Sequence, residues 1–380
     1  MANQQPPAAG RGQVVITGLG VTSAYGRGTA PLLAGVLSGK PAFAPVTRFG
    51  TERCRVKVAA QLPGAPVLAD EITAAVQDAC AAAGLDAGQR AGCELLVALH
   101  SDAAAARDAT AGSAVGDTAA TVASRCGFPA AARVYAAACV AASTAVADAA
   151  SMIVTGQAGR VTVAAGFLVD SDSLSLFDAG RALAADGQVR PFSTGRRGML
   201  LGDGVAAVVL ESAAAAASRG ARPLAVLAGW GRAGDAYHVV QPRPDGSGMA
   251  RAITSALRRA GLSPADIGYV NANGTGTSFS DSAEAAALHR ALGAAAGLVP
   301  VSSTKSVHGH ALEASALLEL VVAVLVLGAG RLPVNAGYLG PDPDCQLDLV
   351  LTSRQASPGY ALSLNAAFGG ANTALLVGAA

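Results

Sequence analysis

Charged side chains are scarce in this chain of 380 residues, and their signs nearly cancel. Asp, Glu, Lys and Arg make up only 14% of the sequence, the formal net charge is +1, and like charges form no block. Binding to nucleic acid or to an anionic membrane surface relies on clustered basic side chains, so the sequence argues against both partners. A hydrophobic content of 52% predicts a large buried core and some surface shared with another subunit.

Cysteine is also sparse, and its spacing fits neither a disulfide framework nor a metal site. The sequence has no Cys-x-x-Cys pair, and His308 and His310 are two residues apart, which does not place them on one helical face. We therefore predict a reduced, cytoplasmic protein without a bound metal. The six cysteines are Cys54, Cys80, Cys93, Cys126, Cys139 and Cys345.

The sequence contains no segment that predicts a signal peptide or a membrane span. Residues 1–13 are polar and rich in Pro, Gly and Gln, which predicts a disordered start. The most apolar stretch, residues 317–327, contains Glu319 and is too short to cross a bilayer, so we expect a buried core helix.

Lysine is rarer still, with three residues (Lys40, Lys57 and Lys305) against 24 arginines. Because arginine is used at nearly every basic position, a lysine close to two histidines is unlikely to be there only as a positive charge. A compact ammonium group on a flexible stem does what the planar guanidinium cannot. Lys305 is therefore a candidate site residue.

Strand-like and helix-like segments alternate along the chain. This alternation predicts an α/β fold with mainly parallel strand pairing, and the halves 14–212 and 213–380 echo each other without a sequence repeat. The expected strands are residues 14–17, 94–99, 161–165, 205–210, 224–228, 267–272, 347–351, 362–364 and 373–377. The expected helices are residues 70–83, 144–155, 249–260, 282–292 and 313–327.

Cys139 lies in Tyr135-Ala-Ala-Ala-Cys-Val-Ala-Ala-Ser143, where a strand-like run meets an Ala-rich helical run. A thiol there sits at the positive end of a helix dipole, near backbone N–H groups that have no partner within the helix. This placement favours the thiolate and could bind a developing oxyanion, as acyl transfer requires. From this segment alone, a small buried apolar cysteine is an equally good interpretation.

Three further blocks decide between the two interpretations. They are Asn273-Gly-Thr-Gly-Thr277, Ser303-Thr-Lys-Ser-Val-His-Gly-His310 and Phe368-Gly-Gly-Ala-Asn372. Together with Cys139, and in this order, they resemble the β-ketoacyl synthases (ketosynthases) of fatty-acid and polyketide assembly. Weaker likenesses along the chain are Val14-Val-Ile-Thr-Gly-Leu-Gly-Val-Thr-Ser23, Arg190-Pro-Phe192, Gly198-Met-Leu-Leu-Gly-Asp-Gly204, Asp235-Ala-Tyr-His-Val239 and Asp281-Ser-Ala-Glu284.

The resemblance implies the thiolase fold, with two similar halves in five α-β-α-β-α layers. It also implies a dimer, with a like or an unlike subunit, and substrates carried on the phosphopantetheine arm of an acyl carrier protein without another cofactor. By the same resemblance, Cys139 attacks the acyl thioester, and the backbone N–H groups of Cys139 and Phe368 form the oxyanion hole. Phe368 also matches the family's gating aromatic residue.

The remaining site residues also follow from the resemblance. His310 matches the second family histidine, which supports the thiolate and contacts the extender thioester. Lys305 matches the family lysine, and Glu319 the glutamate that orients it. Thr275 and Thr277 match threonines associated with the carrier arm.

Asn273 is the main departure, because the family's block begins with histidine. An asparagine amide can donate a hydrogen bond to a thioester oxygen, but it cannot take or give a proton. Asn273 and His310 as two donors could still support decarboxylative condensation. Ketosynthases that lack this histidine, however, resemble types that pass an acyl chain on without extending it.

Smaller departures point to an altered acyl pocket. Ala366 and Ala367 replace the family's Phe-Gly before Phe368, and Met199 stands where an aromatic residue is usual. The lost aromatic bulk should reshape the pocket, and Ala367 would restrict the turn before Gly369 if its backbone needs positive φ. The stretch between Glu94 and Cys139 also looks shorter than in most relatives.

Three functions remain open at this point. The first is an acyltransferase of the ketosynthase type that loads Cys139 and delivers the chain, with or without C–C condensation. The second is a cyclase or offloading enzyme that uses the same acyl-Cys139 intermediate. The third is a non-catalytic partner subunit of the chain-length-factor kind. Asn273 and the short stretch before Cys139 favour it, whereas Cys139, Lys305 and His310 oppose it.

Overall fold

The structure is a computed structural model that describes residues 12–99 and 114–380. Most of the predicted disordered start, residues 1–11, lies outside the described residues. The same holds for residues 100–113, in the stretch before Cys139 that looks short.

A 12-stranded sheet runs through the described part of the molecule, and it consists of two halves of the same design. In the first half β1 and β8 pair antiparallel, β8 and β7 pair antiparallel, and β7, β5 and β6 are parallel. These strands are β1 (Val14–Ser23), β8 (Gly204–Ser212), β7 (Arg160–Phe167), β5 (Glu94–Leu99) and β6 (Ala131–Tyr135).

The second half repeats this sequence of strand directions. Strand β9 pairs antiparallel with β14, β14 pairs antiparallel with β13, and β13, β10, β11 and β12 are parallel. These strands are β9 (Ala225–Gly234), β14 (Ala371–Ala379), β13 (Tyr360–Ala367), β10 (Ile267–Asn271), β11 (Pro300–Ser302) and β12 (Asp348–Leu349).

The halves join where β1 pairs with β9 over a short stretch that starts at Val14↔Leu227 and ends at Ile16↔Ala225. The boundary that we predict between the halves, after residue 212, falls at the junction of β8 and the short helix α8 (Ala213–Ser218). Three short strands complete the described set: β2 (Gly26–Arg27), which pairs antiparallel with the end of β1, and the separate pair β3 (Ala44–Pro45) and β4 (Val58–Ala59).

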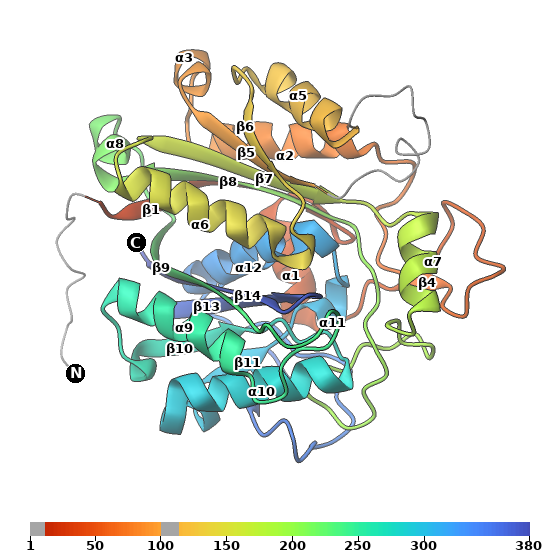
Figure 1. Ribbon diagram of the computed structural model, residues 1–380. Helices are drawn as coiled ribbons and strands as arrows, with labels where there is room; N and C mark the ends of the chain where they lie inside the picture. Colours follow the sequence, from red (N-terminus) through yellow and green to blue (C-terminus); the bar gives the residue numbers. More distant parts are fainter. Residues whose placement is uncertain (1–11, 100–113) are drawn as a thin grey trace.

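Helices cover both outer faces and fill the middle, so that five layers are visible (Figure 1). Helix α2 packs on β1, β8 and β7, α6 and α12 pack between the half-sheets and against each other, and α9 and α10 form the other outer layer. The thiolase-like α/β fold implied by the resemblance is therefore confirmed. The predicted mainly parallel pairing was wrong, because the strands where the two halves join pair antiparallel and only the outer strands of each half are parallel. The helices are α1 (Thr29–Ser38), α2 (Leu68–Ala82), α3 (Ala87–Ala91), α5 (Ala114–Cys126), α6 (Ala141–Val154), α7 (Ser171–Ala179), α9 (Ser247–Ala260), α10 (Ser278–Leu292), α11 (Lys305–His308) and α12 (Ser315–Ala329).

Helix α12 is apolar on nearly every side because both half-sheets and α6 surround it. With the preceding turn it forms an apolar segment, Leu312–Ala329, that is long enough to cross a membrane. This segment is longer than the stretch of residues 317–327 that we singled out, because the flanking residues 312–316 and 328–329 continue it. The predicted burial is confirmed, with 78% of the segment buried.

Candidate functional site

Cys139 lies in a 3-10 turn, η1 (Ala138–Val140), and α6 begins two residues later at Ala141. The turn begins at Ala138, whose backbone φ of 49° is rare for a residue with a side chain. A matching turn, η4 (Leu312–Ala314), precedes α12, and Leu312 there has a φ of 41°. The turns contact each other, so each half of the fold brings the start of its central helix to one place.

The pKa of the Cys139 thiol is raised, whereas the helix dipole alone predicted that it would be lowered. Burial raises the pKa of the thiol to about 12, and the nearby Glu313 carboxylate raises it further, against the Lys305 ammonium group, which lowers it. Loss of water around the thiolate outweighs the helix N-terminus. The sequence could not reveal this balance, because Glu313 reaches the thiol only through the contact between the two turns.

Phe368 lies at the tip of the β13–β14 hairpin, next to the turn of Cys139. Ser143 of α6 and Thr373 of β14 hold the two together through a 2.7 Å hydrogen bond between their hydroxyl groups. Phe368 is 51% exposed, and its ring lies 6.1 Å from that of Phe177 in α7. Phe368 is therefore a partly exposed ring at the tip of a hairpin, in contact with one other ring.

Ala367, which stands where the resemblance leads us to expect glycine, does not strain the backbone of this hairpin. Ala366 and Ala367 continue strand β13, and the positive φ values of the turn fall at Gly369 (90°) and Gly370 (77°). Glycine occupies those positions without the strain that a side chain would add.

The loop that begins at Asn273 is held in place by two buried carboxylates of α10. Glu284 accepts the N–H groups of Asn273 (2.7 Å) and Gly274 (2.8 Å), and Asp281 accepts those of Gly276 (3.1 Å) and Phe192 (2.8 Å). Burial raises the pKa of Glu284 to about 8 and that of Asp281 to about 7. These contacts show that both residues hold the loop.

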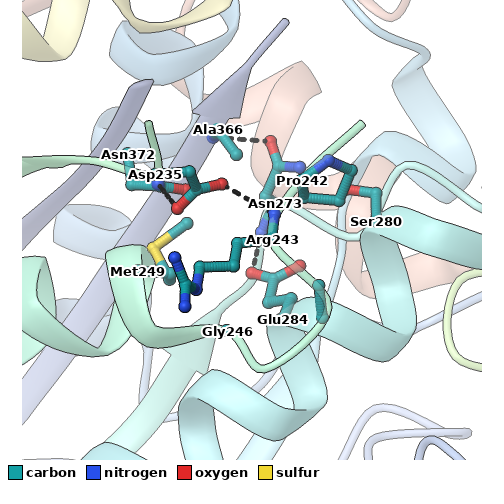
Figure 2. A pocket seen from close by; sticks show the side chains of 11 residues that line it. Asp235, Pro242, Arg243, Gly246, Met249, Asn273, Ser280, Glu284, Ala366 and Asn372 are labelled. Atoms are coloured by element: carbon teal, nitrogen blue, oxygen red, sulfur yellow. Dashed lines mark hydrogen bonds between the residues drawn. The ribbon is translucent and has the colours of Figure 1, made fainter. Parts of the chain in front are cut away.

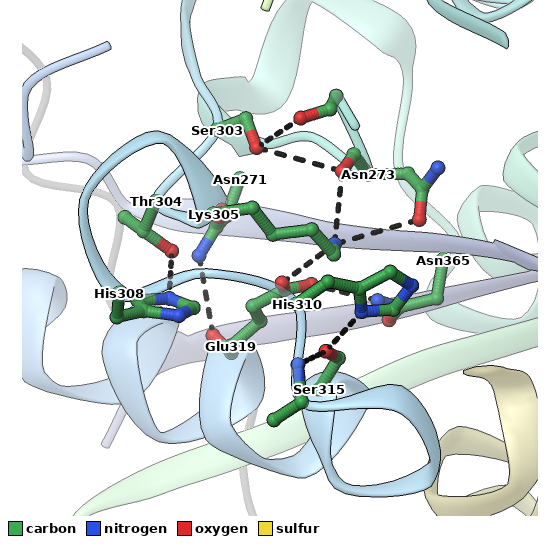
Figure 3. A network of polar contacts seen from close by, with 12 residues as sticks. Asn271, Asn273, Ser303, Thr304, Lys305, His308, His310, Ser315, Glu319 and Asn365 are labelled. Carbon is green, nitrogen blue, oxygen red and sulfur yellow. Dashed lines mark hydrogen bonds and ion pairs between the residues drawn. The ribbon is translucent and has the colours of Figure 1, made fainter. Parts of the chain in front are cut away.

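The side-chain amide of Asn273 has a defined orientation. Its Oδ1 accepts the Ala366 N–H at 3.2 Å and the Lys305 ammonium group at 3.4 Å, and its Nδ2 points away from that group (Figure 3). An amide whose oxygen is held in this way presents its N–H₂ group as the donor. Behind Asn273 lies a cavity of ≈ 20 Å³, room for one water molecule, lined among others by Asp235, Arg243 and Glu284 (Figure 2).

Lys305 is fully buried, and three acceptors surround its ammonium group. They are the Glu319 carboxylate at 2.6 Å, the main-chain oxygen of Asn273 at 2.9 Å and the Asn273 Oδ1. Glu319 in turn accepts the amide of Asn365 at 2.6 Å. The predicted pair of Lys305 and Glu319 is therefore in contact, and it reaches the predicted Asn273 directly.

His310 follows the short helix α11, and its Nδ1 lies 2.7 Å from the hydroxyl oxygen of Ser315. Burial, Lys305 and His308 all lower the pKa of His310 well below its usual value, so the ring is neutral at pH 7. His308 is buried too, with both ring nitrogens satisfied, by Thr304 and by the Gly309 carbonyl. These bonds assign His308 a structural part at the end of α11.

The other predicted residues are placed around this centre. Thr275 and Thr277 share a hydrogen bond of 3.1 Å within the Asn273 loop. Met199 is buried in the main hydrophobic core, and its backbone pairs with Ala182. In the described part of the chain, no three His, Cys, Asp or Glu side chains are grouped so that they could hold a metal ion.

Two residues near the centre were not predicted as site residues, Ser315 and Glu313. The sequence could have predicted a part for Ser315. This serine lies five residues after His310 and begins helix α12, so its side chain can reach back toward the His310 ring. Glu313 carried none, since its relation to Cys139 arises only from the packing of the two halves.

Two profiles of one family match most of the chain. That of the "Beta-ketoacyl synthase, N-terminal domain" matches residues 72–216, and that of the "Beta-ketoacyl synthase, C-terminal domain" matches residues 224–338. The chain belongs to the β-ketoacyl synthase family. This is a family of acyltransferases, in keeping with a cysteine at the start of a central helix.

The curated relatives of this β-ketoacyl synthase family member include "Nodulation protein E" of Rhizobium leguminosarum bv. trifolii, which is 41% identical over 244 residues, 63% of this chain and 59% of that protein. "3-oxoacyl-[acyl-carrier-protein] synthase 2" of Staphylococcus aureus is 38% identical over 205 residues, 53% of this chain and 51% of that protein. The chain thus spans only about half to three fifths of the length of the curated relatives that it matches.

Two solved structures match nearly the whole chain. "The ishigamide ketosynthase/chain length factor" has a TM-score of 0.88 and 29% identity, and covers 98% of this chain and 100% of its own. A type II PKS ketosynthase solved with its acyl-carrier protein, AntDE:AntF, has a TM-score of 0.90 and 26% identity, with the same coverage.

Proposed function

We propose that this protein is a ketosynthase that takes an acyl chain from an acyl carrier protein onto Cys139 and condenses it with a malonyl thioester. The observation that carries the proposal is the fixed Asn273 amide, whose oxygen is held by Ala366 and Lys305. With its N–H₂ group free to donate, Asn273 can do part of what a protonated histidine nitrogen would do in the same place.

Acylation comes first in this proposal. The Cys139 sulfur attacks the thioester carbonyl, the thiol of the carrier's phosphopantetheine leaves, and the thiol proton passes to that leaving sulfur. The N–H groups of Cys139 and Phe368 stabilise the oxyanion, for which the contact between η1 and β13 is suited. The step needs no proton transfer by Asn273.

Condensation then needs a donor pair at the thioester oxygen of the malonyl group. Loss of CO₂ leaves an enolate, which is stabilised by hydrogen bonds and does not require a proton acceptor. The Asn273 amide and the neutral ring of His310 supply the two donors. The enolate carbon attacks acyl-Cys139, the C–S bond breaks, and the Cys139 thiolate that leaves takes a proton from solvent water to restore the thiol. Thr275 and Thr277 would bind the carrier arm, and Met199, Ala366, Ala367 and Gly369 would shape the acyl pocket.

The test is a mixture of the protein with acyl and malonyl carrier proteins, followed by mass spectrometry of the carrier-bound products. A β-ketoacyl product that Cys139→Ala abolishes is the expected result. An unextended chain on the second carrier, with the malonyl group intact, would limit the protein to acyl transfer. A released ring would identify a cyclase.

A second candidate follows from the likeness to the ketosynthase/chain length factor structure. Under it, the chain is a non-catalytic subunit that pairs with a separate ketosynthase. Labelling by an acyl thioester separates the two: a catalytic subunit gains an acyl group on Cys139, whereas a partner subunit remains unlabelled.

An acyl carrier protein and a second ketosynthase-like subunit, identical or not, are the partners that the proposal requires. The structure of the AntDE:AntF complex, in which a ketosynthase carries its acyl-carrier protein, supports the first. The exposed edge of β6, at one end of the sheet, offers a surface for the second. We propose a cytoplasmic location, where such carriers act.

A further inference from the structure

The hydroxyl group of Ser315 lies between a ring nitrogen of His310 and a backbone amide. Its oxygen accepts the Ala311 N–H at 2.9 Å and lies 2.7 Å from the His310 Nδ1 (Figure 3). Ser315 and His310 are 0% and 2% exposed, so water does not compete for these bonds.

The protons on these groups can be placed by counting donors and acceptors. A neutral imidazole has one N–H donor and one bare nitrogen acceptor, and a hydroxyl has one donor. If the Nδ1 carried the proton, the Ser315 oxygen would accept two N–H groups, and its own O–H would need another acceptor. None is recorded for it among the residues that the structure describes. A buried donor left unpaired costs free energy, so the O–H donates to a bare Nδ1.

We propose that Ser315 is a positioning residue that fixes His310 in the tautomer with its proton on Nε2. His310 then offers an N–H donor, and no acceptor, on the side of the ring away from Ser315. Together with the held amide of Asn273, this makes the site a pair of fixed donors. The inference deepens the proposed function, on which its kinetic consequence rests, but the tautomer itself can be observed without any substrate.

Lys305 and His308 contribute to the same state of the ring. The Lys305 ammonium group and His308, on α11, are the groups besides burial that lower the pKa of His310. Lys305 disfavours a second positive charge, so the ring stays neutral, and Ser315 then decides which nitrogen holds the single proton. On α12, Glu319 is paired with Lys305.

The direct test is ¹⁵N NMR of the full-length protein labelled at histidine. The His310 signals are assigned by their loss in His310→Gln. At pH 7 the expected pattern is a neutral ring with a protonated Nε2 and a bare Nδ1. An Nδ1–H tautomer or an imidazolium ring would overturn the inference, whatever the activity of the protein.

The second test uses variants and carrier-bound substrates. Ser315→Ala should give a mixture of tautomers and slow product formation about tenfold, less than the about 100- to 1,000-fold loss expected when a whole oxyanion donor is removed in His310→Ala. Ser315→Thr, which keeps the hydroxyl, should restore both the spectrum and the rate. An unchanged spectrum in Ser315→Ala would overturn the inference.

These readouts separate the inference from the proposed function. If Cys139 never accepts an acyl group while the Nε2–H tautomer is observed and lost in Ser315→Ala, the proposed function fails and the positioning role of Ser315 stands. If Cys139 is acylated and extended but the tautomer does not depend on Ser315, the inference fails alone.

Discussion

At the scale of single residues, the chemistry of the site depends on hydrogen bonds that set the direction of donors. Asn273 replaces a histidine of the family, and its amide could in principle present oxygen or nitrogen to a substrate. Ala366 and Lys305 decide this, since both donate to the oxygen. The residue that departs most from the family is therefore also one of the most firmly held.

Asn273→Asp tests whether the amide acts as a donor. The carboxylate keeps an oxygen for Ala366 and Lys305, so the fold should survive, but it replaces the N–H₂ group with a second acceptor. We expect acylation of Cys139 to continue and the β-ketoacyl product to fall about 100- to 1,000-fold, as for the loss of an oxyanion donor. Mass spectrometry of the protein and of the carrier reports the two steps separately. Equal product from Asn273→Asp and the native protein would contradict the donor role.

The protonated thiol of Cys139 gives a second prediction. Because its pKa is raised to about 12, the reactive thiolate is a small fraction at pH 7 and grows about tenfold per pH unit below that value. Alkylation of the Cys139 peptide by iodoacetamide, followed by mass spectrometry, should therefore rise continuously from pH 7 to pH 10. A plateau reached near pH 8 would show that the helix N-terminus dominates after all.

At the scale of elements, the site is assembled by two central helices and by loops that carboxylates hold. Helix α10 positions the Asn273 loop through Asp281 and Glu284, although neither faces the thiol. The backbone N–H groups of that loop have no strand to pair with, so side-chain oxygens take the place of a strand. A buried carboxylate in this role makes the loop sensitive to pH.

Glu284→Gln should make the stability of the protein less dependent on pH. The pKa of Glu284 is raised to about 8 in the fold. A carboxyl with a raised pKa stabilises the fold below its unfolded pKa, and that contribution is lost as the pH rises through about 8. The free energy of unfolding of the native protein should therefore fall from pH 5 to pH 8 relative to Glu284→Gln, by at most about 1.4 kcal/mol per pH unit.

Urea unfolding at several pH values measures this difference. The matched control is Glu94→Gln, a change of the same kind at an exposed position at the start of β5, which should follow the native curve. Glu284→Gln should also be less stable at every pH, since its N–H₂ group faces a backbone N–H in place of a second acceptor. Parallel pH curves for native protein and Glu284→Gln would contradict the assignment.

At the scale of the whole molecule, the two halves place the starts of α6 and α12 against each other, and the sheet ends in two edges. Strand β12 is two residues long, whereas β6 has five residues, of which three are exposed, and Val134 is 40% exposed. An exposed strand of this length is a template for pairing with another chain.

We therefore expect the protein to associate through β6. Val134→Pro should weaken association, because proline removes a backbone donor and does not fit a paired strand. Analytical ultracentrifugation over a range of concentrations measures the effect. The matched control is Val134→Thr, which keeps the backbone N–H donor at the same position of β6. Equal association of Val134→Pro and the native protein would place the interface elsewhere.

Much of the fold could be predicted from the sequence, since it depends on local patterns. The strand at Glu94–Leu99 was predicted with its bounds, and the five predicted helices all exist, with ends that differ by up to four residues. Asp170 caps α7 by accepting two backbone N–H groups, a local signal that could have predicted this helix. The described helices that were missed are α1, α3, α5, α7, α8 and α11. Strand β11 was missed because three residues give no pattern.

The sequence by itself determined the α/β order, the family motifs and the identity of the candidate site residues, because these depend on residue types and on short spacings. The tertiary structure alone decided how those residues are set for chemistry. The Asn273 amide is oriented by Ala366, 93 residues away, and the Cys139 thiol is kept protonated by burial between the halves and by Glu313. Direction of hydrogen bonds and access of water arise only when distant segments pack together.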